Sequence, residues 1–237
     1  MTATLTIGHG NVYVANRTPL KALRTIRSIQ ADSWGVNEGM NLMRLLPRLS
    51  GYRVTVGDLG PTRNDKRGTW DTPILTKKKL SPLGSVTIQA SETVQPERIA
   101  PERWITGSLF QHAVGPVAHL NVHPNAAIRG HGTNVARVRE YAEFMATLNR
   151  LTRWLQAEDF AVVITGDVNY REDWANVEWD PYAPLRLEDL RPPEGQGLDV
   201  VAWDRRKLEL VRKRVIPAGS RTGADHPWII TELKAAA

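Results

Sequence analysis

In the second half of the chain, short polar groups stand repeatedly at one end of an apolar run. The clearest is AVVITGDVN at 161–169, in which apolar residues form a strand, a glycine allows a turn, and Asp167 and Asn169 follow two positions apart. Side chains two positions apart in a strand point the same way, so these two should face one site. Similar groups occur in LNVH at 120–123, GLDVV at 197–201 and ADHP at 224–227. Because a buried strand needs no carboxylate at its tip, the four groups together indicate a metal-assisted site.

Two clear helices accompany the strand-like runs. Thr18-Pro19 supplies an N-cap and a first-turn proline for one helix, whose predicted inward stripe is Leu20, Leu23, Ile26 and Ile29. The longest helix is predicted over 133–156, where apolar residues recur at three- and four-residue steps. A further helical stretch is predicted over 40–49, directly after Glu38.

Strands are predicted at 4–15, 33–37, 52–56, 73–77, 85–90, 104–112, 117–123, 160–165, 198–203, 208–215 and 228–231. Gly and Pro separate the middle runs, a spacing that is typical of antiparallel hairpins. Helices early, hairpins in the middle and strands at the end together favour mixed sheets flanked by helices. With 237 residues, the chain is expected to form one α/β domain over 1–237.

The chain has no cysteine. This excludes disulfides, thiolate zinc sites and thiol nucleophiles. Any metal must therefore be held by oxygen and imidazole ligands, which favours Mg²⁺, Mn²⁺ or Ca²⁺.

Basic residues outnumber acidic ones, 31 Lys and Arg against 25 Asp and Glu, which gives a net charge of +6 and a pI near 9.8. Phosphate neutralisation releases counterions, so a polyanion is a credible partner. A moderately positive surface without a ligand is the alternative, and charge alone does not separate the two. The basic residues cluster at Lys77-Lys78-Lys79, Arg205-Arg206-Lys207 and Arg212-Lys213-Arg214.

The N-terminus, MTATLTIGHG, lacks a basic region followed by an apolar core, so no signal peptide is predicted. No uninterrupted apolar stretch is long enough to span a membrane. We expect a soluble, cytoplasmic protein with no membrane span and no obligate protein partner.

Taken singly, each polar group has an ordinary explanation, since Gly, Asp and Asn are common in turns. Their order is more informative. It resembles the endonuclease/exonuclease/phosphatase superfamily, the deoxyribonuclease I-like fold, over nearly the whole chain, in the segments HGNVYV, WGVNEG, LNVHP, ITGDVN, GLDVVAW and GADHPWII. The resemblance implies a four-layer α/β sandwich, with two mixed β-sheets packed face to face and helices outside.

The same resemblance implies a metal site. Glu38 is similar to the family's principal metal-ligand carboxylate, Asp225 to a second contact, and Asn11 to a supporting group beside the ion. Mg²⁺ or Mn²⁺ is the expected cofactor, with Ca²⁺ as an additional candidate ion. A hard cation with oxygen ligands keeps several waters and can grip a substrate phosphate.

The resemblance also implies catalytic roles. His226 looks like the general base that takes a proton from the attacking water, and Asp199 like the residue that fixes its tautomer. Asp167 would orient the water and Asn169 would donate to a non-bridging phosphate oxygen. His123 looks like the second histidine, near the leaving oxygen.

Further candidates have weaker support. Asp71, in TWDTPIL, is the candidate for orienting His123, although an Asp at a strand entrance explains it equally well. His131 and Trp174 lie in loops from which they could contact substrate. The other histidines carry less weight: His9 and His112 are interpreted as structural, and His119 as supporting His123 or purely structural.

A metal-dependent nuclease that cleaves DNA or RNA by attack of water is the first hypothesis, because the basic balance suits nucleic acid as the substrate. A phosphatase or phosphodiesterase of a phosphoinositide, a phospholipid head group or another small phosphoester is the alternative within the fold. A non-catalytic nucleic-acid-binding member of the fold is the second alternative. Against it, every polar position that the chemistry requires is occupied by a competent residue.

Overall fold

The structure is a computed structural model that describes residues 3–12, 19–39, 42, 45, 48–57, 68–92, 102–125, 135–169, 198–219 and 222–237. Its helices are α1 (Pro19–Ile29), the short 3₁₀ helix η2 (Gly68–Asp71) and α3 (Val135–Ala157). Its strands are β1 (Thr4–Asn11), β2 (Ser33–Asn37), β3 (Tyr52–Thr55), β4 (Ile74–Lys77), β5 (Pro82–Ser91), β6 (Arg103–His112), β7 (Gly115–Val122), β8 (Ala161–Asp167), β9 (Asp199–Trp203), β10 (Leu208–Ile216) and β11 (Trp228–Ala235).

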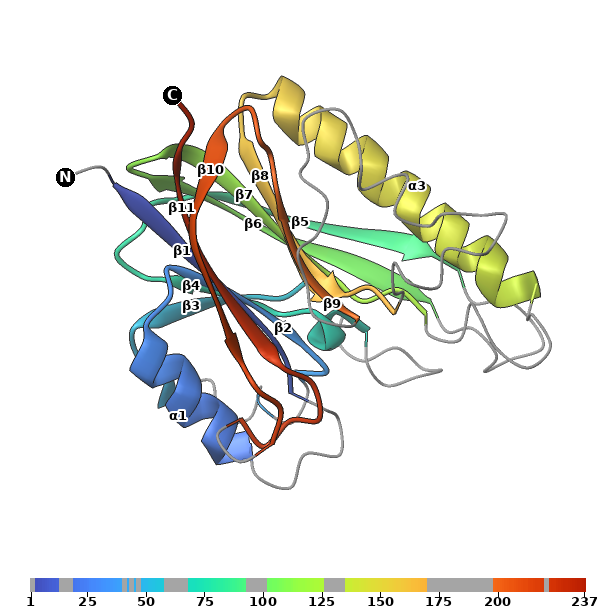
Figure 1. Cartoon of the computed structure of the whole chain (residues 1–237). Coiled ribbons are helices and arrows are strands. Elements are labelled where there is room, and N and C mark those ends of the chain that lie inside the picture. The colour runs from blue at the N-terminus through green and yellow to red at the C-terminus, as the bar shows by residue number, and fades with distance from the viewer. Residues whose placement is uncertain are drawn as a thin grey trace.

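The strands form two sheets, one of six strands in the order β10-β11-β1-β2-β4-β3 and one of five in the order β5-β6-β7-β8-β9. Each sheet contains one parallel pair, β1 with β2 and β7 with β8, and its other pairs are antiparallel. Both sheets are therefore mixed. Figure 1 shows α1 and α3 on opposite sides of the pair of sheets. The predicted sandwich of two mixed sheets with helices outside is confirmed.

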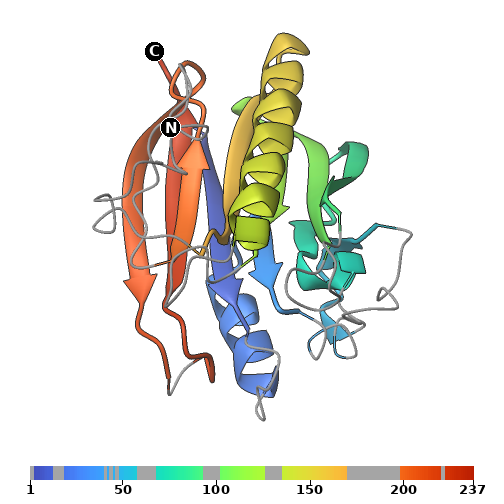
Figure 2. The same cartoon turned by 90° about the vertical axis from the view of Figure 1, so that its right-hand side faces the viewer.

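Three apolar clusters hold the layers together, because each helix buries one apolar stripe and the strands β2, β8 and β9 are buried on both faces. Leu23 and Ile26 of α1 pack against Trp34 on the outer face of the six-stranded sheet. Tyr141 and Phe144 of α3 pack against the outer face of the five-stranded sheet in the same way, and Figure 2 shows α3 lying over the strands. The third cluster fills the space between the sheets at one end of the sandwich.

The residues that face the space between the sheets change from apolar to polar along the strands. Every second residue of a strand faces this space, and at one end these residues belong to the apolar inter-sheet cluster. Towards the other end they become buried His, Asn, Thr and Asp. The series are Leu5, Ile7, His9 and Asn11 in β1; Val117, His119, Asn121 and His123 in and after β7; Ala161, Val163, Thr165 and Asp167 in β8; and Trp203, Val201 and Asp199 in β9.

Hydrogen bonds across this polar layer tie the two sheets to each other. The ring of His119 lies between the hydroxyls of Ser33, 2.7 Å from Nδ1, and Thr165, 2.8 Å from Nε2. Ser33 belongs to the six-stranded sheet, whereas His119 and Thr165 belong to the five-stranded sheet. The Asn121 amide donates across the same gap to the carbonyl of Val36 at 2.9 Å. Directional bonds of this kind fix how one sheet sits on the other, which apolar packing alone does less strictly.

We expect the protein to lose stability below pH 6.5 because of His119. Burial, with a smaller contribution from the nearby charge of His9, lowers the pKa of His119 to about 3 from its usual 6.5. Below pH 6.5 the unfolded chain therefore binds a proton at His119 that the folded protein excludes. Above pH 6.5, His119 does not lower the free energy of unfolding. Below it, the free energy of unfolding falls by up to about 1.4 kcal/mol per pH unit. Chemical denaturation from pH 7 to 5 measures the slope.

A flatter slope in His119→Gln than in the wild-type protein would assign the effect to this ring. NMR titration of the folded wild type gives a check that does not depend on the variant's folding. A His119 ring resonance that titrates near pH 6.5 in the folded protein would contradict the expectation.

Most predicted elements occur within a few residues of their predicted bounds, and 33–37 agrees at both ends. Leu20 was predicted to face inward, but it is 44% exposed because α1 meets the sheet through Ala22, Leu23 and Ile26. The glycine of GDVN was predicted to allow a turn, but Gly166 lies inside β8. A Cβ there would lie 2.2 Å from the Val122 carbonyl oxygen, so this glycine permits close approach of β7.

Parts of two predicted elements lie outside the described residues. These are 13–15 of the predicted first strand and most of the predicted helical stretch over 40–49. In the part of the chain that the structure describes, no helix combines the length and the hydropathy that crossing a membrane requires.

Candidate active site

The polar strand ends meet because of the strand registers. Asp167 at the end of β8 pairs with Asp199 at the start of β9. His123 directly follows Val122, which pairs with Gly166 in the parallel β7–β8 ladder. Each of these three residues has at most 4% of its surface exposed. One edge of the five-stranded sheet therefore presents two carboxylates and an imidazole side by side.

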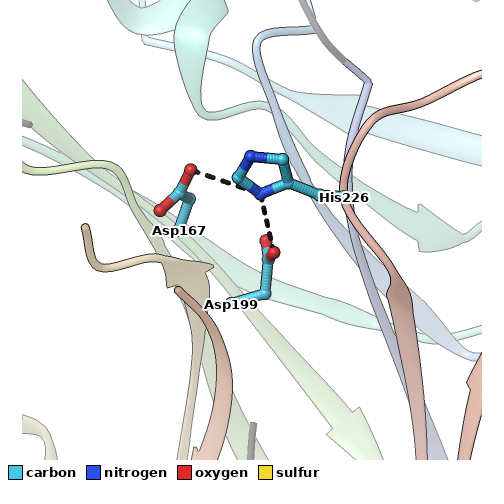
Figure 3. A group of neighbouring side chains, drawn as sticks. All are labelled: Asp167, Asp199 and His226. Carbon is cyan, nitrogen blue, oxygen red and sulfur yellow. Dashed lines mark hydrogen bonds and ion pairs between the residues drawn. The ribbon is translucent and has the colours of Figure 1, made fainter. Parts of the chain in front are cut away.

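A buried carboxylate links two histidines in this site. Asp199 Oδ2 lies 2.8 Å from His226 Nδ1, and Asp199 Oδ1 lies 2.7 Å from His9 Nε2. Figure 3 shows the His226 ring held over Asp199 and Asp167. The contact directs His226 Nδ1–H towards Asp199, which leaves Nε2 as the ring nitrogen that can exchange a proton with a substrate.

Asp199 and the two histidines that contact it shift one another's protonation equilibria. The hydrogen bond that His226 donates to Asp199 is the largest cause that raises the pKa of His226, to about 9, and it outweighs partial burial. Burial alone would raise the pKa of Asp199, but the hydrogen bonds of His226 and His9 hold it below its ordinary value. Asp199 therefore stays ionised while it orients His226.

Asp167 lies at the centre of the site. Its Oδ2 accepts a hydrogen bond from Asn11 Nδ2 at 3.1 Å and lies 3.9 Å from His123 Nε2 and 3.6 Å from His226 Nδ1. Its Oδ1 accepts a hydrogen bond from the backbone N–H of Asn169 at 3.0 Å. Burial raises the pKa of Asp167, while the nearby histidines act against the rise. Both histidines thus converge on one carboxylate.

The second histidine has its own orienting carboxylate. His123 Nδ1 lies 2.7 Å from Asp71 Oδ2, and the same oxygen accepts a hydrogen bond from Arg103 Nη1 at 2.8 Å. Arg103 Nε in turn donates to Asn125 Oδ1, and Asn125 Nδ2 donates to Glu140 of α3. The chain of buried contacts connects the His123 ring to the helix outside the sheet.

Asp71 also sets the charge of His123. Burial would lower the pKa of His123, but the charge and hydrogen bond of Asp71 outweigh it and raise the pKa above its ordinary value. The ring nitrogen opposite Asp71 is Nε2, which faces Asp167. His123 can therefore present a proton at Nε2.

Glu38 lies directly after β2, at the same edge of the six-stranded sheet as Asn11. Asn11 pairs with Asn37 in the parallel β1–β2 ladder, and the Glu38 amide donates to the Asp71 carbonyl at 2.9 Å. Glu38 is half-buried with φ at 53°, and Asn169 has φ at 52°. A left-handed backbone costs a non-glycine residue roughly 1–2 kcal/mol and is frequent at functional sites.

The donor chemistry at this edge fits a hard divalent cation. Carboxylate and amide oxygens of Glu38, Asn11 and Asp225 are the ligand types that Mg²⁺ and Mn²⁺ prefer. Asp225 is exposed and directly precedes His226, whose pKa its charge also raises.

A second group of ligand atoms lies within 4.8 Å of one another, on Asp167, Asp199 and His226. A metal ion there would compete with the hydrogen bond between Asp199 and His226. The group can therefore either keep this hydrogen bond, which orients His226, or bind a metal ion.

Not every predicted site residue can be placed. His131 and Trp174 lie outside the described residues.

His9, interpreted from the sequence as structural, contacts the site directly. Its position two residues before Asn11, on the same face of β1, was the signal that could have identified it. Arg103 carried no such signal, because nothing in the sequence around it indicates that its side chain is buried and bound to Asp71.

Asn37 is a further site residue that the sequence reasoning missed. Its Oδ1 accepts a hydrogen bond from the Asp167 amide at 3.1 Å, and its Nδ2 donates to the Val122 carbonyl at 2.9 Å. This one side chain joins the polar edges of the two sheets.

The sequence matches no family model and no curated protein sequence, whereas the fold matches many solved structures. An endonuclease/exonuclease/phosphatase family protein from Bacteroides thetaiotaomicron superposes with a TM-score of 0.75 at 15% identity, covering 100% of both chains. The human Nocturnin catalytic domain, solved with a bound sulfate anion, gives 0.69 at 13% identity over 100% of this chain and 97% of that one.

A mannosyl-6-phosphatase from the same Bacteroides species gives a TM-score of 0.67 at 14% identity, over 97% of this chain and 99% of that one. Matches of this length at such low identity show a shared fold. The chain therefore has the deoxyribonuclease I-like fold of the endonuclease/exonuclease/phosphatase superfamily, as the order of its polar motifs predicts.

Proposed function

We propose that this protein is a divalent-metal-dependent phosphodiester hydrolase, and that nucleic acid, DNA or RNA, is its substrate. The observation that carries the proposal is a pair of histidines, each oriented by its own buried carboxylate, that converge on Asp167. Two imidazoles so arranged provide a proton acceptor and a proton donor on either side of a bound phosphoester.

His226 is the proton acceptor in this proposal. Its Nδ1 is held by Asp199 at 2.8 Å, so Nε2 is the atom that takes a proton from the attacking water. Asp199 stabilises the imidazolium that results, as a buried carboxylate does beside other catalytic histidines. Asp167, which lies 3.6 Å from the same ring, orients the water through its carboxylate.

His123 is the proton donor on the other side. Asp71 fixes Nδ1, and Nε2 lies towards Asp167 and the open edge of the sheet. A proton at Nε2 can pass to the leaving oxygen. The Asn169 backbone N–H donates to Asp167, and its side-chain Nδ2 donates to the Pro124 carbonyl at 2.9 Å, so this amide would have to leave Pro124 to donate to a phosphate oxygen.

Glu38, Asp225 and Asn11 would hold the divalent cation. When bound there, Mg²⁺ or Mn²⁺ would neutralise charge on the phosphate and, as a nearby positive charge, lower the pKa of His226 towards neutrality. Without it, the pKa of about 9 keeps His226 protonated at neutral pH. The arrangement is therefore consistent with a requirement for metal.

A small phosphoester is the second candidate substrate. Its support is the structural similarity to a mannosyl-6-phosphatase, at a TM-score of 0.67. The net charge of +6 favours the polyanion instead. The non-catalytic alternative is disfavoured by the complete set of oriented polar groups in the site.

Cleavage of supercoiled plasmid in the presence of Mg²⁺ or Mn²⁺ is the experiment that tests the proposal. We expect nicking that requires metal and that is lost in Glu38→Ala. Glu158→Ala is the matched control: it removes an exposed carboxylate directly after the C-terminus of α3 and should behave as wild type. Single-stranded DNA and RNA are assayed in parallel.

Hydrolysis of a sugar phosphate or inositol phosphate, with every nucleic acid left intact, would replace the nuclease by the small-phosphoester enzyme. No hydrolysis of either class in either metal, by folded protein, would overturn the enzymatic proposal. Binding of nucleic acid without cleavage would then leave the non-catalytic alternative.

A further inference from the structure

The helix α1 carries three exposed cations that form no ion pair with an acid among the described residues, although Arg27 Nη2 donates a hydrogen bond to the Arg48 carbonyl. Lys21, Arg24 and Arg27 recur at three-residue steps and are exposed, while Leu23 and Ile26 make the packing contacts. The sequence of α1, PLKALRTIRSI, contains no acidic residue. Like charges three residues apart repel, and a cation in the first helical turn opposes the helix dipole, so this pattern costs the helix stability.

A basic hollow of about 620 Å³ lies on one side of α1. Arg27 lines it together with Lys77, Lys78 and Lys79. Lys77 is paired with Asp32 at 3.1 Å, whereas Lys78 and Lys79 are exposed on the turn that follows β4. One of the three basic clusters of the sequence therefore lies beside the basic helix.

A second basic cluster lies on the other side of α1. Arg212 and Arg214 are exposed on β10. Both line a hollow of about 310 Å³ beside α1, and Arg214 also lines a second hollow, of about 480 Å³, together with Arg24. Among the described residues that line the three hollows, one is acidic, Glu232. In contrast, in the third cluster Arg206 pairs with Asp204, and Lys207 with Asp159.

We infer that the surface formed by Lys21, Arg24, Arg27, Lys78, Lys79, Arg212 and Arg214, called here the α1 surface, binds the phosphate backbone of a nucleic acid outside the catalytic site. Within the described ranges, no ion pair joins any of these seven residues to an acid. Unpaired cations of one sign on a helix and both its flanks favour a polyanion over a single phosphate.

The dimensions of the α1 surface suit a nucleic acid. The 11 residues of α1 extend over about 16 Å, the axial distance of roughly five phosphates along one strand of a duplex. Arg214 pairs with Ile230, and Ile230 pairs with Gly8, three residues before Asn11 and hence about 10 Å from it along β1. One end of the surface thus approaches the catalytic edge from the outer face of the sheet.

Binding to the α1 surface does not require cleavage, and the inference depends on the proposed function only in the choice of nucleic acid as the polyanion. The test therefore uses His226→Ala protein with EDTA, so that no substrate is consumed. Fluorescence anisotropy with a labelled DNA duplex, titrated at several salt concentrations, gives the Kd and its salt dependence.

Arg24→Gln with Arg214→Gln removes two charges from the α1 surface. We expect the Kd to rise about tenfold and the slope of log K against log salt to fall by about two. Arg150→Gln with Arg153→Gln removes two exposed charges from α3, on the opposite side of the sandwich, and is the matched control. It should leave Kd within about twofold of the parent protein, because its charges lie outside the contact.

Equal weakening by both pairs would reduce the effect to net charge and overturn the inference, as would unchanged binding in the α1 variant. Binding of phosphatidylserine vesicles but not DNA, with the same dependence on Arg24 and Arg214, would replace the nucleic acid by an acidic membrane. Plasmid nicking by wild type together with normal DNA binding by the α1 variant would overturn this inference and leave the proposed function intact. DNA binding that depends on Arg24 and Arg214, without plasmid nicking by wild type, would support this inference and contradict the proposed function.

Discussion

Replacing His226 with alanine is expected to lower kcat for phosphodiester hydrolysis by about 10³-fold and to change KM little. The ring is half-buried and fixed by Asp199, and its Nε2 is the atom that takes the proton from water in the proposed mechanism. Removing it leaves the proposed metal ligands and His123 in place, so substrate should still bind. Steady-state kinetics at saturating Mg²⁺ or Mn²⁺, with the substrate found in the cleavage assay, measures both constants.

A matched control is His112→Ala. His112 is also a half-buried histidine, but it ends β6 next to the β6–β7 turn, away from the polar edge of the sheets. Its replacement should leave kcat unchanged. If His226→Ala, folded by circular dichroism, retained more than about a tenth of wild-type kcat, His226 would not be the general base.

The polar edge of the sheets could be predicted from the sequence because its signals are local. In β8 the apolar run ends in Asp167 and Asn169, and the strand period alone says that they face one way. The same reasoning applied to β7 and β9 identifies His123 and Asp199. The resemblance to a known family supplied the order in which these ends meet, and the strand registers agree with it.

Contacts between distant segments could not be predicted in this way. His9 and Asp199 are 190 residues apart, and Arg103 and Asp71 are 32 apart. A histidine in an apolar strand looks the same in sequence whether its partner is a hydroxyl, as at His119, or a carboxylate of the candidate site, as at His9. The partner depends on how two sheets stack, which no single strand pattern records.

Leu20 and Gly166 show a related limit at the level of single residues. Helical periodicity places Leu20 at the border of the apolar stripe, and the crossing of α1 over the sheet decides that it is exposed. Glycine before Asp-x-Asn is typical of a turn, but close contact with Val122 requires it within a strand. The exposure of Leu20 and the need for glycine at position 166 therefore both depend on contacts with neighbouring elements, which the local sequence does not show.

His9 is expected to act as a positioning residue for His226. Its ring is fully buried, and its Nε2 lies 2.7 Å from the Asp199 oxygen that His226 does not use. His9→Leu would leave that oxygen buried without this donor, which would weaken the hold of Asp199 on the His226 ring. We expect kcat to fall by about 10- to 100-fold, as is common when a residue that orients a site group is removed, with KM nearly unchanged.

His9→Gln distinguishes orientation from simple packing, because the glutamine amide can donate from nearly the same place as Nε2. It should restore kcat to within about threefold of wild type. Thr165→Val is a matched control for stability: it removes a hydrogen bond of the same polar layer, to His119, without touching Asp199. Both His9→Leu and Thr165→Val should lower the free energy of unfolding by about 1–3 kcal/mol, but only His9→Leu should lower kcat. Equal kcat for folded His9→Leu and wild type would reduce His9 to a structural role, because Asp199 would then hold His226 without it.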